Sequence, residues 1–215
     1  MKINNSIQIL KESNIKEIIK NISDALLQTT LNDFKLLSNL PMVGMAFSVY
    51  GAINSVRDIV YLNNVLKFLI ETSEITLEER EAFVMQLEKE PKNYERLCIS
   101  SVALLSNFED QRKASILGLI IKYRIKNKIT TECFLRLSFA VSKVFVDDLK
   151  NLQKFHFAKI PSSEDINLLH SGLLYNKGLG WNNSRDSDKY IDHYILNRDG
   201  NQLCYILREE NFQFD

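Results

Sequence analysis

The sequence predicts a mainly α-helical fold, in which a multi-helix bundle over residues 1–158 precedes a small α+β module over residues 159–215. Up to residue 157, apolar residues recur at steps of three and four, the spacing of an amphipathic helix. After Gly172 the chain becomes richer in glycine and asparagine, and residues 190–196 alternate as a strand does. A chain of 215 residues can bury a stable core without disulfides or metals.

The first predicted helix covers residues 7–27, and a second begins at Pro41, because a proline suits the first turn of a helix. Residues 40–53 carry no charge and are the most hydrophobic part of the chain. These 14 residues fall short of the ~20 that a membrane-spanning helix needs, so we expect a buried core helix. The alternative is a segment that inserts into a membrane or lies on it. In either case the residues of this segment that would contact a partner or a membrane are Met42, Met45, Phe47 and Tyr50.

Arg57 and Asp58 interrupt the apolar pattern, which otherwise continues as a helix to about residue 72. We expect this pair to be partly buried. A buried ion pair more often sets specificity than performs chemistry, so we interpret both residues as candidates for partner recognition or bundle registry.

Four further helices complete the predicted bundle. Thr76 and Glu79 match a capping box and begin a helix over residues 77–89. Pro91 begins the next, which ends near Asn107, and another covers residues 110–127. The last starts after Thr131 and is expected to run without a break to about Phe157.

The C-terminal module is predicted to be helix, strand, loop, strand and helix. A capped helix begins at residues 162–165 and Gly172 ends it. Residues 173–175 form a short strand, residues 176–189 a polar loop, and residues 190–196 the second strand. Asn197 caps a final helix over residues 198–208.

Two runs, Leu168-Leu169-His170-Ser171-Gly172-Leu173-Leu174 and Tyr194 to Leu203, resemble the wing end of winged-helix modules. This C-terminal end is also similar to those of uncharacterised bacterial helical proteins that, like this chain, carry Leu40-Pro41, residues 55–58 and residues 67–69 in an apolar N-terminal helix. The first resemblance implies binding to nucleic acid or protein and implies no reaction. The wing contacts would be Lys177, Trp181, Arg185 and Lys189.

The helix preceding the wing departs from a DNA-reading helix. It begins Ser162-Ser163-Glu164-Asp165, and His170 is its one candidate cation, whereas base and phosphate contacts need Arg, Lys, Asn or Gln. We therefore favour a protein partner, or a second copy of the chain, over nucleic acid. The turn at residues 126–128 likewise lacks the acidic metal ligands of the tellurite-resistance-type helical domains that the hairpins resemble.

No recognisable catalytic centre is present in the sequence, and we expect the chain not to be an enzyme. Cys98, Cys133 and Cys204 lie among apolar neighbours, where a buried thiol has a raised pKa. The pairs Asp147-Asp148 and Asp192-His193 place neighbouring side chains in diverging directions. A phosphate-binding glycine loop and metal-spaced Cys or His residues are absent, so we expect no cofactor, no metal and no small-molecule substrate.

Lys and Arg equal Asp and Glu at 27 each, so no net field draws in nucleic acid or an anionic membrane. The N-terminus lacks the pattern of a signal peptide, and we expect a cytoplasmic protein, with a position at the membrane periphery as the alternative. The leading hypothesis is a non-catalytic bacterial binding or effector protein that acts through protein–protein contacts, by analogy in host–phage conflict or a membrane-directed response. The alternative hypothesis is a winged-helix-type DNA-binding regulator.

Overall fold

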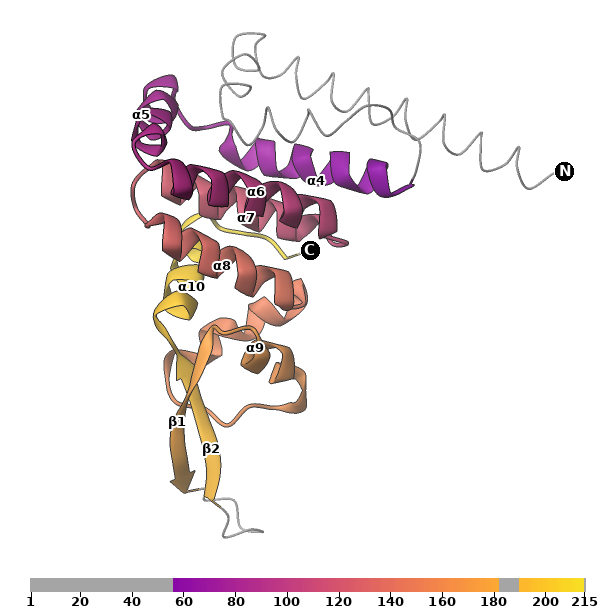
Figure 1. Cartoon of the computed structure of the whole chain (residues 1–215). Helices are drawn as coiled ribbons and strands as arrows, with labels where there is room; N and C mark the ends of the chain where they lie inside the picture. The colour runs from indigo at the N-terminus through magenta and orange to yellow at the C-terminus, as the bar shows by residue number, and fades with distance from the viewer. Residues whose placement is uncertain (1–55, 182–189, 215) are drawn as a thin grey trace, which may run out of the picture. The chain divides into compact units, whose positions relative to one another are not determined.

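The computed structural model describes residues 56–181 and 190–214, and these residues are mainly helical with one small antiparallel sheet (Figure 1). The predicted fold class, mainly α with a strand-containing C-terminal part, is confirmed at that level. The predicted helix over residues 7–27 and the apolar segment 40–53 lie outside the described residues. Within the described residues, none of the helices has the length and apolar character that crossing a membrane requires.

The chain forms two compact units that divide between Lys126 and Asn127. The boundary expected from the sequence, between residues 158 and 159, falls inside the second unit. The last helix of the chain packs against elements on both sides of that expected boundary, so they belong to one core.

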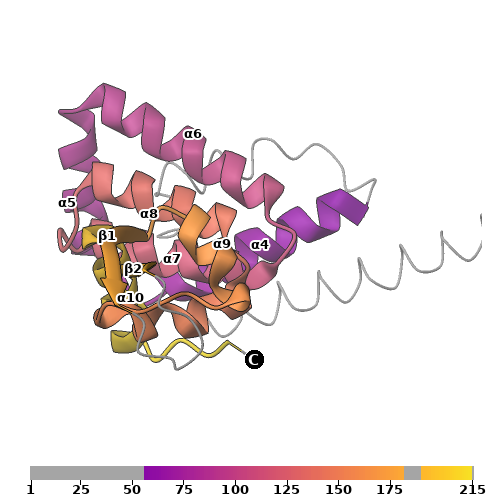
Figure 2. The same cartoon turned by 90° about the horizontal axis from the view of Figure 1, so that it is seen from below.

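The described part of the first unit contains α4 (Val56–Thr72), α5 (Leu77–Glu88), α6 (Pro91–Asn107) and α7 (Gln111–Ile125). Helix α4 packs along α7 and also contacts α6 (Figure 1), and α5 lies where α6 begins (Figure 2). Helix α7 is buried at every position from Ala114 to Ile125, so it forms the centre of this unit.

Gly118 allows α4 and α7 to approach closely. A Cβ atom at this position would lie 2.8 Å from the Phe68 carbonyl oxygen and 2.8 Å from the Glu71 Cβ. A larger residue would therefore push the two helices apart. On the same helix α4, Asn64 is fully buried, and its Nδ2 donates to the carbonyls of Leu105 (2.9 Å) and Phe108 (2.8 Å). These bonds hold the end of α6 against α4 and satisfy carbonyls at a helix C-terminus.

Side-chain caps define the helix starts where the sequence predicts them. The Thr76 hydroxyl accepts from the Glu79 amide (3.2 Å), and the Glu79 carboxylate accepts from the Thr76 amide (3.0 Å), which confirms the capping box of α5. Such a cap typically contributes about 1 kcal/mol. Asp110 likewise accepts from the Arg112 amide (2.9 Å) at the start of α7.

The helix expected from Thr131 to Phe157 is wrong, because the structure breaks it into α8 (Thr131–Lys143) and the 3-10 helix η1 (Val146–His156). Val144 and Phe145 between them have extended backbones, with ψ of 150° and 135°. In an extended chain alternate side chains share a side. Val144 and Val146 can therefore both be buried, at 1% and 2% exposed, while Phe145 points to solvent.

The second unit continues with the 3-10 helix η2 (Ser163–Asp165) and the short α9 (Ile166–His170). Ser162 and Asp165 form a capping box, and Gly172, with φ of +81°, ends the helical segment, both as predicted. Strands β1 (Leu174–Trp181) and β2 (Tyr190–Leu196) then pair antiparallel.

Strand β1 is longer than predicted, because residues 176–181, expected to be loop, pair with β2. The register shifts between Asn176 and Gly178, where Gly178 has φ of +104° and its amide donates to the Asn176 side chain (2.7 Å). A glycine bulge at this point thus lets the strand continue past the residues that break its alternating pattern. On the other edge of β2, Lys159 and Tyr194 form an isolated antiparallel bridge.

Helix α10 (Arg198–Glu209) closes the second unit and packs on α8, η1 and β2. Asn197 caps it by accepting from the Gly200 amide (2.8 Å), as predicted. The chain then turns at Asn211, with φ of +49°, and residues 212–214 continue without regular secondary structure. We call residues 211–214 the C-terminal tail.

Candidate functional site

The structure describes few of the residues that the sequence singles out. Met42, Met45, Phe47 and Tyr50 lie outside the described residues, as do Arg185 and Lys189. Nothing in the described chain therefore brings the predicted membrane-binding residues or the full set of wing contacts together.

Arg57, Lys177 and Trp181 are placed on elements of the structure. Arg57 is exposed in the first turn of α4, which contradicts its expected partial burial. The long side chain of an arginine at a helix start reaches water readily. Asp58 also belongs to α4. Lys177 is exposed on β1, and Trp181 is the last residue of that strand.

Exposed phenylalanines are a feature of the second unit that the sequence analysis missed. Phe139 lies on α8, Phe145 in the break after it and Phe157 directly after η1, and they are 61%, 68% and 83% exposed. Scattered single apolar residues are normal on a protein surface. Three phenylalanines with more than half of their surface exposed nevertheless lie within 19 residues of chain, 139–157.

The local backbone explains why these rings face water. Phe145 alternates with the buried Val144 and Val146, and Phe157, with φ of −110° and ψ of 153°, leaves the 3-10 helix just after the buried Phe155. The Lys143 ammonium lies 5.2 Å from the centre of the Phe139 ring and partly covers that residue.

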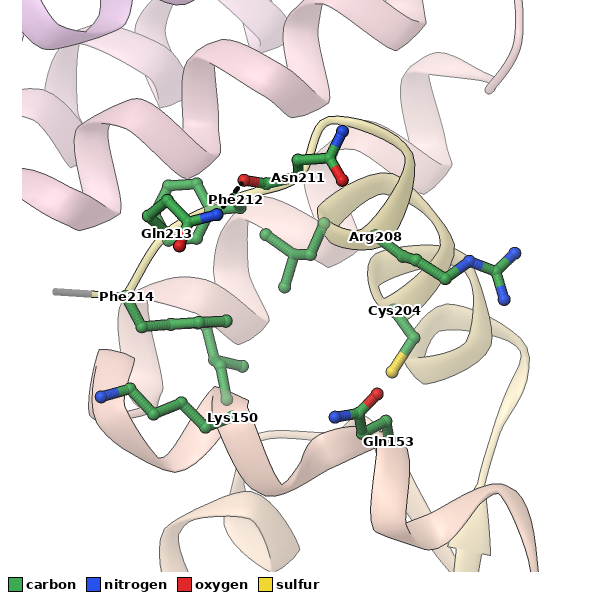
Figure 3. A pocket seen from close by; sticks show the side chains of 10 residues that line it. Lys150, Gln153, Cys204, Arg208, Asn211, Phe212, Gln213 and Phe214 are labelled. Carbon is green, nitrogen blue, oxygen red and sulfur yellow. Dashed lines mark hydrogen bonds between the residues drawn. The ribbon is translucent and has the colours of Figure 1, made fainter.

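A hollow of about 240 Å³ lies between η1, α10 and the C-terminal tail (Figure 3), and we call it the tail pocket. Its apolar lining comes from all three segments. The lining residues are Leu149, Lys150, Gln153, Cys204, Leu207, Arg208, Asn211, Phe212, Gln213 and Phe214. Figure 3 shows the Cys204 sulfur facing the open centre.

The C-terminal tail forms one wall of the tail pocket. The Phe212 amide donates to the Leu207 carbonyl (2.9 Å) directly after the Asn211 turn. The Phe212 and Phe214 rings meet edge to face, with centres 5.1 Å apart. The backbone hydrogen bond therefore attaches the tail to the end of α10, and the two rings pack on each other within the tail.

Both cations of the tail pocket lie at its rim. The Lys150 ammonium and the Arg208 guanidinium point away from the open centre (Figure 3). Lys150 lies 3.4 Å from an Asp147 oxygen and 6.0 Å from the Phe214 ring centre. Arg208 lies 3.7 Å from a Glu209 oxygen. Each rim cation thus has a carboxylate neighbour, although no carboxylate side chain is among the ten lining residues.

The thiols behave as the sequence predicts. Burial raises the pKa of Cys98 to about 11 and that of Cys204 to about 11, and it also raises the pKa of Cys133. A thiol with a raised pKa is a poor nucleophile at neutral pH. Across residues 56–181 and 190–214, no group of three or more His, Cys, Asp or Glu side chains could hold a metal ion.

Sequence reasoning missed the tail pocket because its walls meet only after folding. The alternation of Phe212 and Phe214 after a polar residue is the one local signal of an ordered tail. No protein-family model matches the chain, and neither a curated protein nor a solved structure shows significant similarity to it.

Proposed function

We propose that this chain is a non-catalytic binding protein that acts through contact with a protein partner. The exposure of Phe145 and Phe157 carries the proposal. Aromatic residues are enriched at protein interfaces, where each ring buries a large apolar area with few rotatable bonds. A partner surface that covers either ring would remove it from water at little cost in side-chain entropy.

The raised pKa of the three thiols argues against nucleophilic catalysis by a cysteine. A catalytic cysteine needs a stabilised thiolate, whereas burial here disfavours the charged form of Cys98, Cys133 and Cys204. The cysteines thus serve as small apolar residues.

A DNA-binding regulator of winged-helix type is the second candidate. The observation in its favour is that β1 and β2 pair antiparallel and that Lys177 on β1 is exposed, since a wing also contains two paired strands. Two features of α9 count against this candidate: the helix has only five residues, and its basic residue in the last turn is His170. Such a helix offers few side chains that could hydrogen-bond to base edges. The prediction for this candidate is binding to DNA that weakens steeply with salt and with Lys177→Ala.

The proposed function is tested by affinity purification with the full chain as bait, followed by reconstitution with the purified captured protein. Phe157→Ser and Phe145→Ser are compared with the wild type, and Lys154→Ala, at an exposed position of η1, is the matched control. We expect each phenylalanine variant to weaken the reconstituted complex by roughly tenfold or more. The control should bind as the wild type does.

The same preparations distinguish a second copy from another protein. Light scattering reports the mass of the purified chain, and a homo-oligomer that dissociates in Phe157→Ser identifies the partner as a second copy. A partner bound equally by the wild type and both phenylalanine variants contradicts the proposal.

A further inference from the structure

We propose that the partner contributes an extended segment that pairs, as an added β-strand, with the backbone of Ala158 and Ile160, beside the exposed ring of Phe157. We call residues 158–160 the open edge. The inference rests on the proposed function and states what is recognised on the partner, namely its main-chain N–H and C=O groups. It depends on the backbone of this chain, whereas the proposed function depends on its aromatic rings, so the two can fail separately.

The open edge lies beside β2 as a very short third strand. The Lys159 amide donates to the Tyr194 carbonyl (3.0 Å), and the Tyr194 amide donates to the Lys159 carbonyl (2.9 Å), so both backbone groups of Lys159 point toward β2. In an antiparallel pair, the residues on either side of such a doubly bonded residue direct their N–H and C=O groups to the opposite edge. Those residues are Ala158 and Ile160. Pro161 has no N–H, so the pairing with β2 ends after Lys159 and the edge stays short.

The outward groups of the open edge are unpaired. Within residues 56–181 and 190–214, the N–H and C=O groups of Ala158 and Ile160 make no hydrogen bond. Ala158 is exposed, Ile160 is half-buried, and Phe157, directly before them, is 83% exposed. Because residues in a strand rise by ~3.4 Å each, the two outward residues repeat their donor and acceptor every ~7 Å. An extended backbone offers complementary groups at that repeat, so the edge itself specifies the class of its occupant.

The outer edge of β1 is built differently. Its register shifts between Asn176 and Gly178, where Gly178 has φ of +104°, and Lys177 in this bulge is exposed. A bulge and an exposed lysine are features by which proteins keep an edge strand from pairing with another chain. At the open edge, by contrast, the Lys159 ammonium lies 5.4 Å from the centre of the buried Phe155 ring, so this lysine packs on a core residue.

Hydrogen exchange in the free chain tests whether the edge is open. The Lys159 amide is bonded to β2 and should exchange slowly, whereas the amides of Ala158 and Ile160 should exchange at unprotected rates. Nuclear magnetic resonance of the isotope-labelled full chain resolves these three amides from one another.

The binding test uses an uncharged probe, the peptide acetyl-Thr-Val-Thr-Val-Thr-amide, with the same labelled chain. Hydrogen bonds to the two N–H and two C=O groups of the open edge predict a dissociation constant of ~1 mM or lower. The largest shift changes should fall on the amides of Ala158 and Ile160. A peptide methylated at every backbone nitrogen should not bind, and about 0.5 M NaCl should leave the affinity of the unmodified peptide unchanged, because the contacts are uncharged.

Ala158→Pro removes one outward N–H and keeps the fold. Proline is tolerated in an edge strand where its nitrogen faces away from the sheet. The residue before a proline must be extended, as Phe157 is, with φ of −110° and ψ of 153°. This variant should weaken peptide binding by roughly fivefold or more. Ala158→Ser, the matched control, keeps the N–H and should bind as the wild type does, and both variants should retain the Tm of the wild type.

Slow exchange of the Ala158 and Ile160 amides in the free chain overturns the inference, because the edge is then already covered. No binding at about 5 mM peptide, or binding that Ala158→Pro leaves unchanged, overturns it as well.

The reconstituted partner complex separates this inference from the proposed function. If Phe157→Ser weakens the complex and Ala158→Pro does not, the ring binds the partner and the added strand is refuted. If Ala158→Pro weakens the complex while Phe145→Ser and Phe157→Ser do not, the added strand is retained and the role of the exposed rings is removed.

Discussion

Arg136 of α8 donates two hydrogen bonds to the Asp199 carboxylate at the start of α10, from Nε to Oδ2 (2.8 Å) and from Nη2 to Oδ1 (3.2 Å). The two residues are 63 positions apart in the sequence, and their contact joins α8 to α10. Asp199 also lies in the first turn of α10, where a negative charge is favoured by the helix dipole. One side chain thus connects the beginning of the second unit to its final helix.

We expect Arg136→Gln to lower the Tm of the protein in low salt. The Tm of Arg136→Lys should lie between those of the wild type and Arg136→Gln, because lysine keeps the charge but cannot form the two-point contact. Thermal unfolding in 20 mM and 500 mM NaCl checks this, and the loss should shrink at the higher salt, since the pair is at the surface. An unchanged Tm for Arg136→Gln in low salt would show that the contact has no energetic role.

Gly118→Ala should destabilise the first unit by about 1–3 kcal/mol, because the added Cβ would overlap the Phe68 carbonyl and the Glu71 side chain. On helix propensity alone the same change would be stabilising by up to ~1 kcal/mol. The sign of the change in the free energy of unfolding therefore shows whether close packing or helix propensity dominates at Gly118. Denaturant unfolding measures it, with Ala103→Ser at an exposed position of α6 as the control, expected to change stability by less than ~0.5 kcal/mol.

The Glu74–Lys122 pair predicts a pH dependence of stability. The hydrogen bond from the Lys122 ammonium (2.7 Å), and then its charge, hold the pKa of Glu74 below the ordinary value. A carboxyl group whose pKa is lower in the folded than in the unfolded state stabilises the protein at pH values above the unfolded-state pKa. This contribution is lost as the pH falls through the folded-state pKa.

The Tm of the wild type should therefore exceed that of Glu74→Gln at pH 7, and the difference should disappear as the pH falls below ~4. Glu74 is 73% exposed, although Lys122 is 7% exposed, so solvent screening keeps the effect small. A difference that grows on acidification would contradict the assignment.

Alkylation of Cys204 should keep rising tenfold per pH unit beyond pH 9, because the thiolate is the reacting form and burial raises the pKa to about 11. A short peptide containing one cysteine serves as the control, and its rate should level off near its ordinary pKa of ~8.5. If the Cys204 rate stops rising at the same pH as the peptide rate, the thiol is solvated and the pocket wall is open at this residue.

Local signals in the sequence predicted most of the helix ends. Thr76, Asn197 and Gly172 act within a few residues of their own position, so caps and a helix-ending glycine are visible without tertiary structure. The break at Val144 and Phe145 was missed because apolar residues on both sides continue a helical spacing. Which of them is buried depends on α10 and the rest of the second core.

The candidate surfaces were harder to predict for the same reason. Phe145 lies in a stretch that the sequence predicts to be one continuous helix, and it is exposed in the break that the structure shows there. Cys204 and Leu149, 55 residues apart in the sequence, both line the tail pocket. Lys177, predicted to lie in a polar loop, is exposed on strand β1, and its role as a wing contact stays a prediction. Patterns in sequence report the local conformation, and the surface that results depends on packing between distant segments.

The most direct test of partner binding is the dissociation constant of the reconstituted complex for the wild type, Phe157→Ser and Lys154→Ala, each first shown to be folded by circular dichroism. We predict an affinity lowered by roughly tenfold or more in Phe157→Ser alone. Equal affinities for all three proteins would contradict the claim that the second unit binds its partner through exposed aromatic rings.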